Sequence, residues 1–171
     1  MILNALRALR GGLRRRDVPP RTRELLAHYA GEHQVVRDVL AGLRDTADLV
    51  ATDPASPRCL PAVRETHRRL TERVLPHEAA EERQLYPALA SPLGSGEATS
   101  TMSRAHVEIR RQVDLLGAQL AQTADGRLRP DQVPDLLATL YGLDAVLRLH
   151  LAQEEEEFFS LDPSDPTTAR R

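Results

Sequence analysis

The stretch LPHEAAEERQLYPAL, residues 75–89, is the most informative part of the sequence. It returns in outline 73 residues later as RLHLAQEEEEFFSLD, residues 148–162. Each copy holds a histidine followed four positions later by a glutamate, first His77 with Glu81 and then His150 with Glu154. Residues four apart lie on the same face of an α-helix. We therefore expect two helices that each present one imidazole and one carboxylate to the same small volume.

The repeat extends well beyond these two motifs. His33 and His106 also lie 73 residues apart, and each precedes the histidine of its motif by 44 residues. Apolar and proline positions keep the same offset: Pro61 with Pro134, Val63 with Leu136, Leu70 with Leu143, Val74 with Leu147, and Val36 with Ile109. Histidines, core positions and helix starts thus all recur at the same offset of 73 residues. Such a repeat predicts a duplicated pair of helices.

Helical spacing of apolar residues predicts four helices, over about residues 22–50, 60–89, 103–122 and 131–161. Proline- and glycine-containing segments separate them. Four helices joined by short loops favour an all-α, up-down-up-down four-helix bundle. The histidines then lie near the starts of the first and third helices and near the ends of the second and fourth. An antiparallel arrangement brings all four to the same end of the bundle.

Two further segments flank the predicted bundle of residues 20–162. Residues 1–19 form a basic amphipathic arm, with apolar residues at helical spacing among arginines. Such an arm either binds an anionic membrane surface or a partner, or packs on the bundle or frays. Residues 163–171 are rich in proline, serine and threonine, and we expect them to be disordered.

Composition narrows the class of protein. With 171 residues the chain is long enough for one domain with its own core. Aromatic residues are only 3% of the chain, so leucine, valine and alanine must build that core. The net charge of −2 gives no reason to expect nucleic acid binding. Cys59 is the single cysteine, which excludes an intrachain disulfide and a cysteine zinc site. We find no apolar run long enough to span a membrane and no signal-peptide core, and we expect a cytoplasmic protein.

The candidate site combines four imidazoles with two carboxylates. Each imidazole binds one metal ion, whereas a carboxylate can bridge two. The set therefore suits a dinuclear centre with two bridging glutamates, and the mixture of nitrogen and oxygen donors suits iron, manganese or zinc. The alternative is that these residues fill the core and satisfy one another. Six such residues at one end of a bundle favour the metal centre, because unpaired buried polar groups cost several kcal/mol.

The combined pattern resembles a known family, the hemerythrin-like, HHE cation-binding domain. The resemblance covers roughly residues 22–161 and rests on GEHQVVRDVL (31–40), LPHEAAEERQLYPAL (75–89), RAHVEIRRQ (104–112) and LRLHLAQEEEEFFSL (147–161). It implies a four-helix bundle with a non-haem centre of two iron ions that binds oxygen, nitric oxide or peroxide, or senses iron or redox state. The metal ligands that it implies are His33, His77, Glu81, His106, His150 and Glu154.

This chain departs from the oxygen-carrying hemerythrins at two points. They have a second histidine on the third helix, where this sequence has Arg110, and an aspartate on the fourth helix, where it has Glu154 one position earlier. One imidazole is therefore missing, and water or Glu78 can take its place. Glu78 lies about 100° round the helix from His77, so it needs a local distortion, which Pro76 can supply. An open coordination position favours reactivity or sensing over stable oxygen carriage.

Several residues near the site have two interpretations. Tyr29, Met102, Leu85 and Phe158 are expected to form a lid, in which Tyr29 either packs or donates a hydrogen bond to a bound oxygen species. On the other side of the site, valine, isoleucine and leucine are expected to form an apolar floor, at Val36, Val74, Ile109 and Leu147.

Other polar residues lie close to the predicted ligands in the sequence. His67 is expected to be a buried, hydrogen-bonded core histidine, with proton relay as its alternative. Glu82 and Glu155 either contact the ligating imidazoles or belong to the solvated surface. His28 is expected to be exposed.

The sequence supports three functions. The first is a di-iron protein that binds oxygen or a related small molecule for sensing or buffering. The second is a di-iron enzyme of oxidative or nitrosative stress, which consumes peroxide or nitric oxide or takes part in iron repair. The third is a structural zinc bundle or an interaction bundle that docks through residues 1–19.

Overall fold

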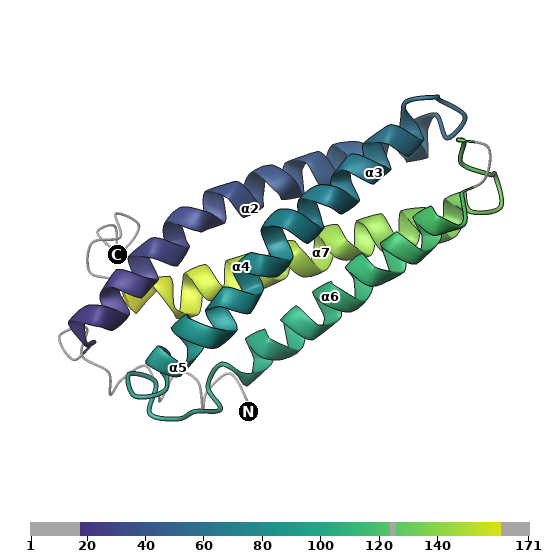
Figure 1. Cartoon of the computed structure of the whole chain (residues 1–171). Helices are drawn as coiled ribbons and strands as arrows, with labels where there is room; N and C mark the ends of the chain where they lie inside the picture. Colours follow the sequence, from purple (N-terminus) through teal and green to yellow (C-terminus); the bar gives the residue numbers. More distant parts are fainter. Residues whose placement is uncertain (1–17, 124–125, 162–171) are drawn as a thin grey trace.

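The computed structural model describes residues 18–123 and 126–161, and all regular structure in these ranges is helical. The chain forms α2 (Pro20–Thr52), then α3 (Cys59–Arg69), η2 (Leu70–Val74), α4 (Leu75–Ala80), η3 (Glu81–Leu85) and α5 (Tyr86–Leu89). α6 (Ser100–Ala121), α7 (Val133–Glu157) and η4 (Phe159–Leu161) follow. Figure 1 shows a helical bundle, with α2, the α3–α5 stretch, α6 and α7 side by side along one long axis. None of the helices in the described ranges is long and apolar enough to cross a membrane.

The four predicted helices are present, with differences at their ends. α2 and α6 begin two or three residues before the predicted positions. α7 stops at Glu157, and a 3₁₀ turn continues to Leu161, so the prediction of one helix to residue 161 was wrong there. Most of the predicted arm and all of the predicted tail lie outside the described residues. Val18, at the end of that arm, is buried.

The second helix was predicted as one regular helix, but two π-helical segments interrupt it. η2 ends where the Leu75 N–H donates to Leu70 O, and η3 ends where the Tyr86 N–H donates to Glu81 O. Each donor comes directly before a proline, Pro76 or Pro87. Proline has no N–H to give to the carbonyl four residues earlier, so the wider turn accommodates it. The distortion expected from Pro76 is thus present as a π turn.

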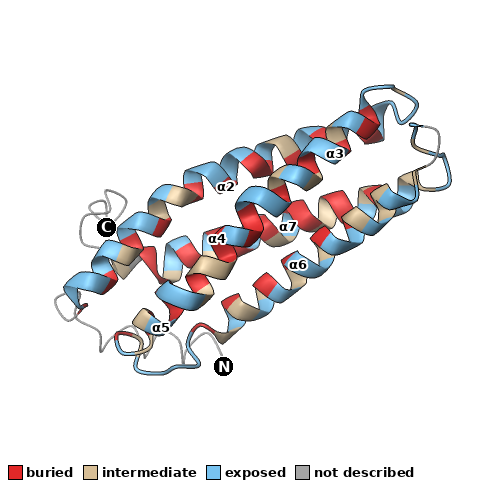
Figure 2. Ribbon diagram, in the orientation of Figure 1, coloured by how far each residue is buried: buried red, intermediate tan, exposed pale blue. Residues whose placement is uncertain are grey.

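Two buried apolar clusters occupy the interior, and Figure 2 shows the buried positions facing inward on each helix. The larger one, the long core, contains the expected floor residues Val36, Val74, Ile109 and Leu147. The smaller one, the end cluster, consists of Val18, Leu26, Tyr29, Leu85, Tyr86, Leu89, Met102, Phe158 and Phe159. The expected lid residues all belong to the end cluster. The predicted ligands lie one helical turn from each cluster and therefore between them.

The 73-residue offset is visible in the contacts as well as in the sequence. Thr46 and Thr66 share a hydrogen bond of 2.8 Å between their hydroxyl groups. At the equivalent positions, Gln119 Nε2 donates to Thr139 Oγ1 at 3.0 Å. The two halves of the chain thus pair their helices at corresponding places.

Candidate metal centre

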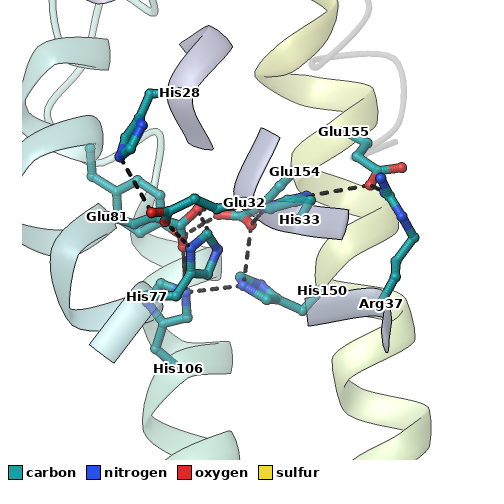
Figure 3. A network of polar contacts seen from close by, with 11 residues as sticks. His28, Glu32, His33, Arg37, His77, Glu81, His106, His150, Glu154 and Glu155 are labelled. Atoms are coloured by element: carbon teal, nitrogen blue, oxygen red, sulfur yellow. Dashed lines mark hydrogen bonds and ion pairs between the residues drawn. The ribbon is translucent and has the colours of Figure 1, made fainter. Parts of the chain in front are cut away.

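The six predicted ligands converge at one place, and each comes from the interior face of its helix. The most exposed is His77, with 8% of its surface accessible, and both glutamates are fully buried. Donor atoms of Glu81, His106, His150 and Glu154 lie within 4.8 Å of one another, and so do those of His33, His77 and Glu81. Figure 3 shows the imidazoles gathered around the two carboxylates. Glu81 belongs to both groups and lies between them.

The two carboxylates contact imidazoles from different helices. Glu81 Oε1 lies 3.2 Å from His77 Nε2 and 3.6 Å from His33 Nε2. Its other oxygen, Oε2, lies 3.5 Å from His106 Nε2. Glu154 Oε2 lies 3.3 Å from both His33 Nε2 and His150 Nε2. Glu81 therefore lies among imidazoles of three helices, and Glu154 lies among imidazoles of two.

Many of the inward-facing atoms have no hydrogen-bond partner among the described residues. They are His33 Nε2, His77 Nε2, both oxygens of Glu81 and Glu154 Oε2. In addition, His106 Nε2 and His150 Nε2 are only 3.0 Å apart. Two imidazole nitrogens at this distance need a proton or a cation between them. Buried polar groups are normally satisfied, so the cluster is able to bind metal ions and its donor atoms fit them.

Three half-exposed carboxylates orient the imidazoles from outside. His77 Nδ1 donates to Glu32 at 2.9 Å, and His106 Nδ1 donates to Glu82 at 3.0 Å. His33 Nδ1 lies 3.3 Å from Glu155 Oε1, which also pairs with Arg37. Such contacts fix the tautomer and turn Nε2 toward a metal ion. Glu82 and Glu155 are thus both solvent-accessible and in contact with imidazoles of the cluster.

His150 is the exception among the four imidazoles. Its Nδ1 is buried and has no hydrogen-bond partner in the described part of the chain. The residue equivalent to Glu32 in the second half of the repeat is Ala105. The second half of the repeat therefore has no carboxylate equivalent to Glu32 that could accept a hydrogen bond from His150 Nδ1.

The metal-free cluster binds protons strongly. Burial alone would raise the pKa of the Glu81 carboxyl, but contacts with His106, His33 and His77 hold it well below its usual range. Burial lowers the pKa of His33, yet the Glu154 and Glu81 carboxylates outweigh this effect and raise that pKa to about 9. The pKa of His106 also rises to about 9, against the effect of burial and chiefly through Glu81. Protons therefore neutralise the carboxylates when no other cation does.

Glu78 points into the same region. It is 3% exposed, and its Oε1 has no hydrogen-bond partner among the described residues. Burial raises the pKa of Glu78 to about 8, although His106 acts in the opposite direction. Glu78 is therefore a protonated side chain at neutral pH in the metal-free protein, close to His106.

Tyr86 is the residue of the site that the sequence did not reveal. Its hydroxyl donates to Glu154 Oε1 at 2.5 Å and lies 3.2 Å from His106 Nε2. Burial, together with the Glu154 and Glu81 carboxylates, raises the pKa of Tyr86 above its usual value. Regular helical spacing places Leu85, not Tyr86, on the face of Glu81. The π turn of η3 brings Tyr86 round to that face, and only the proline at position 87 hinted at it.

The remaining predictions around the site had mixed outcomes. Tyr29 packs edge-on against His77, with ring centroids 5.8 Å apart. His28 is exposed as expected and pairs with Glu32 at 3.4 Å. The prediction for His67 was wrong, because its ring is only half-buried, lies against Gly117 and makes no hydrogen bond among the described residues. Gly117 leaves room for this ring beside α6.

These features define an all-helical protein with a buried histidine and glutamate cluster that can bind metal ions. The model of the hemerythrin HHE cation binding domain matches residues 24–161. The chain therefore belongs to this family. No curated protein and no solved structure matches the chain.

Proposed function

We propose that His33, His77, Glu81, His106, His150 and Glu154 hold two metal ions, with Glu81 between the ions. The proposal is carried by inward-facing atoms of His33, His77, Glu81 and Glu154, which have no hydrogen-bond partner among the described residues. Four imidazoles and two carboxylates are donors that iron accepts well, and manganese and zinc accept the same set. We assign two iron ions, which would supply redox chemistry and a position for an exogenous ligand.

We further propose that the centre binds oxygen, nitric oxide or peroxide in order to sense or buffer it. The surroundings support a small ligand. The long core and the end cluster close the site on both sides with apolar side chains. Such walls exclude water and suit a small uncharged molecule. The arrangement that we propose for the helices is the antiparallel up-down-up-down bundle, because it brings the four histidines to one end.

A specific observation favours peroxide reduction as a second candidate. Reduction of peroxide to water consumes two protons and two electrons, and a pair of ferrous ions would supply the electrons. Glu78 is a carboxyl group buried beside the cluster, with an Oε1 that has no hydrogen-bond partner among the described residues, and is placed to deliver a proton there. Purified iron-loaded protein that is given a reductant should then consume peroxide, and Glu78→Gln should slow this turnover while the iron content stays the same. Absence of turnover in the unsubstituted protein would remove the enzyme from consideration.

The first experiment is the metal content per chain after anaerobic purification, with optical spectra before and after exposure to air. We expect about two irons per chain and new absorption from an oxo-bridged pair on oxidation. His150→Ala should lower the metal content, and His67→Ala, a histidine outside the cluster, should not. Zinc without a spectral change, or one ion per chain, would contradict the proposal.

A further inference from the structure

The duplication is broken at one aromatic position beside the site. Residue 86 in the first half is tyrosine, and the equivalent residue 159 in the second half is phenylalanine. The Phe159 ring lies edge-on against His33, with centroids 4.7 Å apart, whereas the Tyr86 ring stacks on His106 at 5.4 Å. Only one half of the site therefore contains a hydroxyl group at this position.

This difference makes the two buried glutamates unequal. Neither oxygen of Glu81 has a hydrogen-bond partner among the described residues. Glu154 has one such oxygen, Oε2, because its Oε1 accepts the Tyr86 hydroxyl at 2.5 Å. Glu81 thus has two oxygens that accept no hydroxyl hydrogen bond from the described residues, and Glu154 has one.

The Tyr86 hydroxyl has little freedom to leave Glu154. The ring is nearly parallel to that of His106, at 7°, and packs against Phe158 with centroids 5.9 Å apart. The side chain is buried at 4% exposure, so water is not at hand to replace the carboxylate as acceptor. A hydrogen bond to a charged acceptor in such surroundings is among the stronger ones. A metal ion that bound Glu154 Oε1 would have to share this oxygen with the Tyr86 hydroxyl, which weakens the oxygen as a ligand and fixes its direction.

We propose that Tyr86 is a positioning residue, which holds Glu154 Oε1 so that this carboxylate binds one ion through Oε2 and does not bridge to the other. The position on the other ion that Oε1 would take in a bridge would then stay open for the exogenous ligand. This inference rests on the proposed dinuclear centre and adds to it a residue that controls how open the centre is. Tyr86 acts through Glu154 and keeps its proton throughout.

The test compares full-length wild-type protein with Tyr86→Phe, which removes the hydroxyl and copies the residue of the other half. Tyr29→Phe is the matched control, because Tyr29 is equally buried in the end cluster but makes no hydrogen bond to a site carboxylate among the described residues. Zinc-loaded samples report the carboxylate mode by infrared spectroscopy. The antisymmetric and symmetric stretches lie farther apart for a carboxylate that binds through one oxygen than for one that binds through two.

We expect the loaded-minus-free infrared spectrum of wild type to contain one widely split carboxylate, and that of Tyr86→Phe to have lost it. Tyr29→Phe should resemble wild type. In the ferric proteins, azide should bind to Tyr86→Phe about tenfold more weakly or worse, the factor set by a hydrogen bond to a charged group. The number of ions per chain should not change.

Two results would overturn the inference. One is an unchanged carboxylate spectrum in Tyr86→Phe. The other is a phenolate-to-iron charge-transfer band in the ferric wild-type protein, which would make Tyr86 a ligand, and this measurement needs no variant. Both differ from a failure of the dinuclear centre itself, because wild-type protein that binds fewer than two ions would contradict the proposed function before any variant is made.

Discussion

Replacing Glu81 by glutamine perturbs the centre of the site most directly. The amide keeps the size of the side chain but removes its negative charge. Glu81 is fully buried and lies within 3.6 Å of the Nε2 atoms of His33, His77 and His106. In the metal-free protein, these three imidazoles lose the carboxylate that they share. In the loaded form that we propose, both ions would lose the ligand that lies between them.

The magnitude follows from what remains around the imidazoles. Breaking a buried charge pair by removal of one partner costs about 3–5 kcal/mol. His33 keeps Glu154, and His106 keeps Glu82. We therefore expect a loss at the lower end, about 3 kcal/mol in the free energy of unfolding of metal-free protein at pH 7. Domains of this size have about 5–15 kcal/mol in total, so the variant should still fold.

The assay is urea unfolding in the presence of a chelator, followed by circular dichroism, with metal content measured on separate samples. Glu72→Gln is the matched control, since Glu72 is on the same helical stretch but pairs with Arg68 at the surface. The control should unfold at nearly the wild-type urea concentration and keep its metal. A Glu81→Gln protein with wild-type stability, or with two tightly bound ions, would refute our reasoning about this carboxylate.

Other predictions concern pH, burial and metal removal. The pKa values of His33 and His106 rise from 6.5 to about 9 on folding. Their contribution to the free energy of unfolding is therefore complete below about pH 6.5 and is lost as the pH rises toward 9. The urea midpoint of metal-free protein should fall over this range, and metal affinity should rise, since the ions displace these protons. Because the pKa of Glu78 rises from 4.5 to about 8 on folding, its cost to the free energy of unfolding accumulates from about pH 4.5 to pH 8. Glu78→Gln should therefore raise the urea midpoint of metal-free protein at pH 8 much more than at pH 4.5; equal midpoints at pH 8 would contradict this. Leu143→Ala, at a fully buried position of the long core, should cost about 2–5 kcal/mol without changing the metal content. A chelator should lower the melting temperature of loaded wild-type protein by the linkage of binding to folding.

Much of the site could be predicted because its ligands follow regular helical geometry. His77 and Glu81 are four apart within one helical stretch, as are His150 and Glu154, and the repeat supplied the two remaining histidines. Such spacing fixes a common face regardless of what surrounds it. The apolar floor and lid followed from the same periodicity, one turn to either side.

The parts that escaped prediction depend on departures from that geometry or on contacts between helices. Tyr86 lies on the wrong face of a regular helix, and only the π turn of η3 corrects its direction. Glu32 precedes the ligand His33 but contacts His77, a residue of another helix. Helical spacing places His67 on the inward face of the second predicted helix. Gly117 on the neighbouring helix nevertheless lets the His67 ring lie at the edge of the core. None of these follows from one helix considered alone.

We expect the π turns to give the two halves of the site different backbone stiffness. α4, which carries His77, lies between η2 and η3, whereas His150 and Glu154 lie within the unbroken α7. π turns and the prolines beside them interrupt the regular ladder of amide hydrogen bonds. Amide protons around α4 should therefore exchange with deuterium faster than those of α7, and metal binding should protect them most. We therefore expect ligand-driven movement to be concentrated in this short segment, with α7 as the frame against which the segment adjusts.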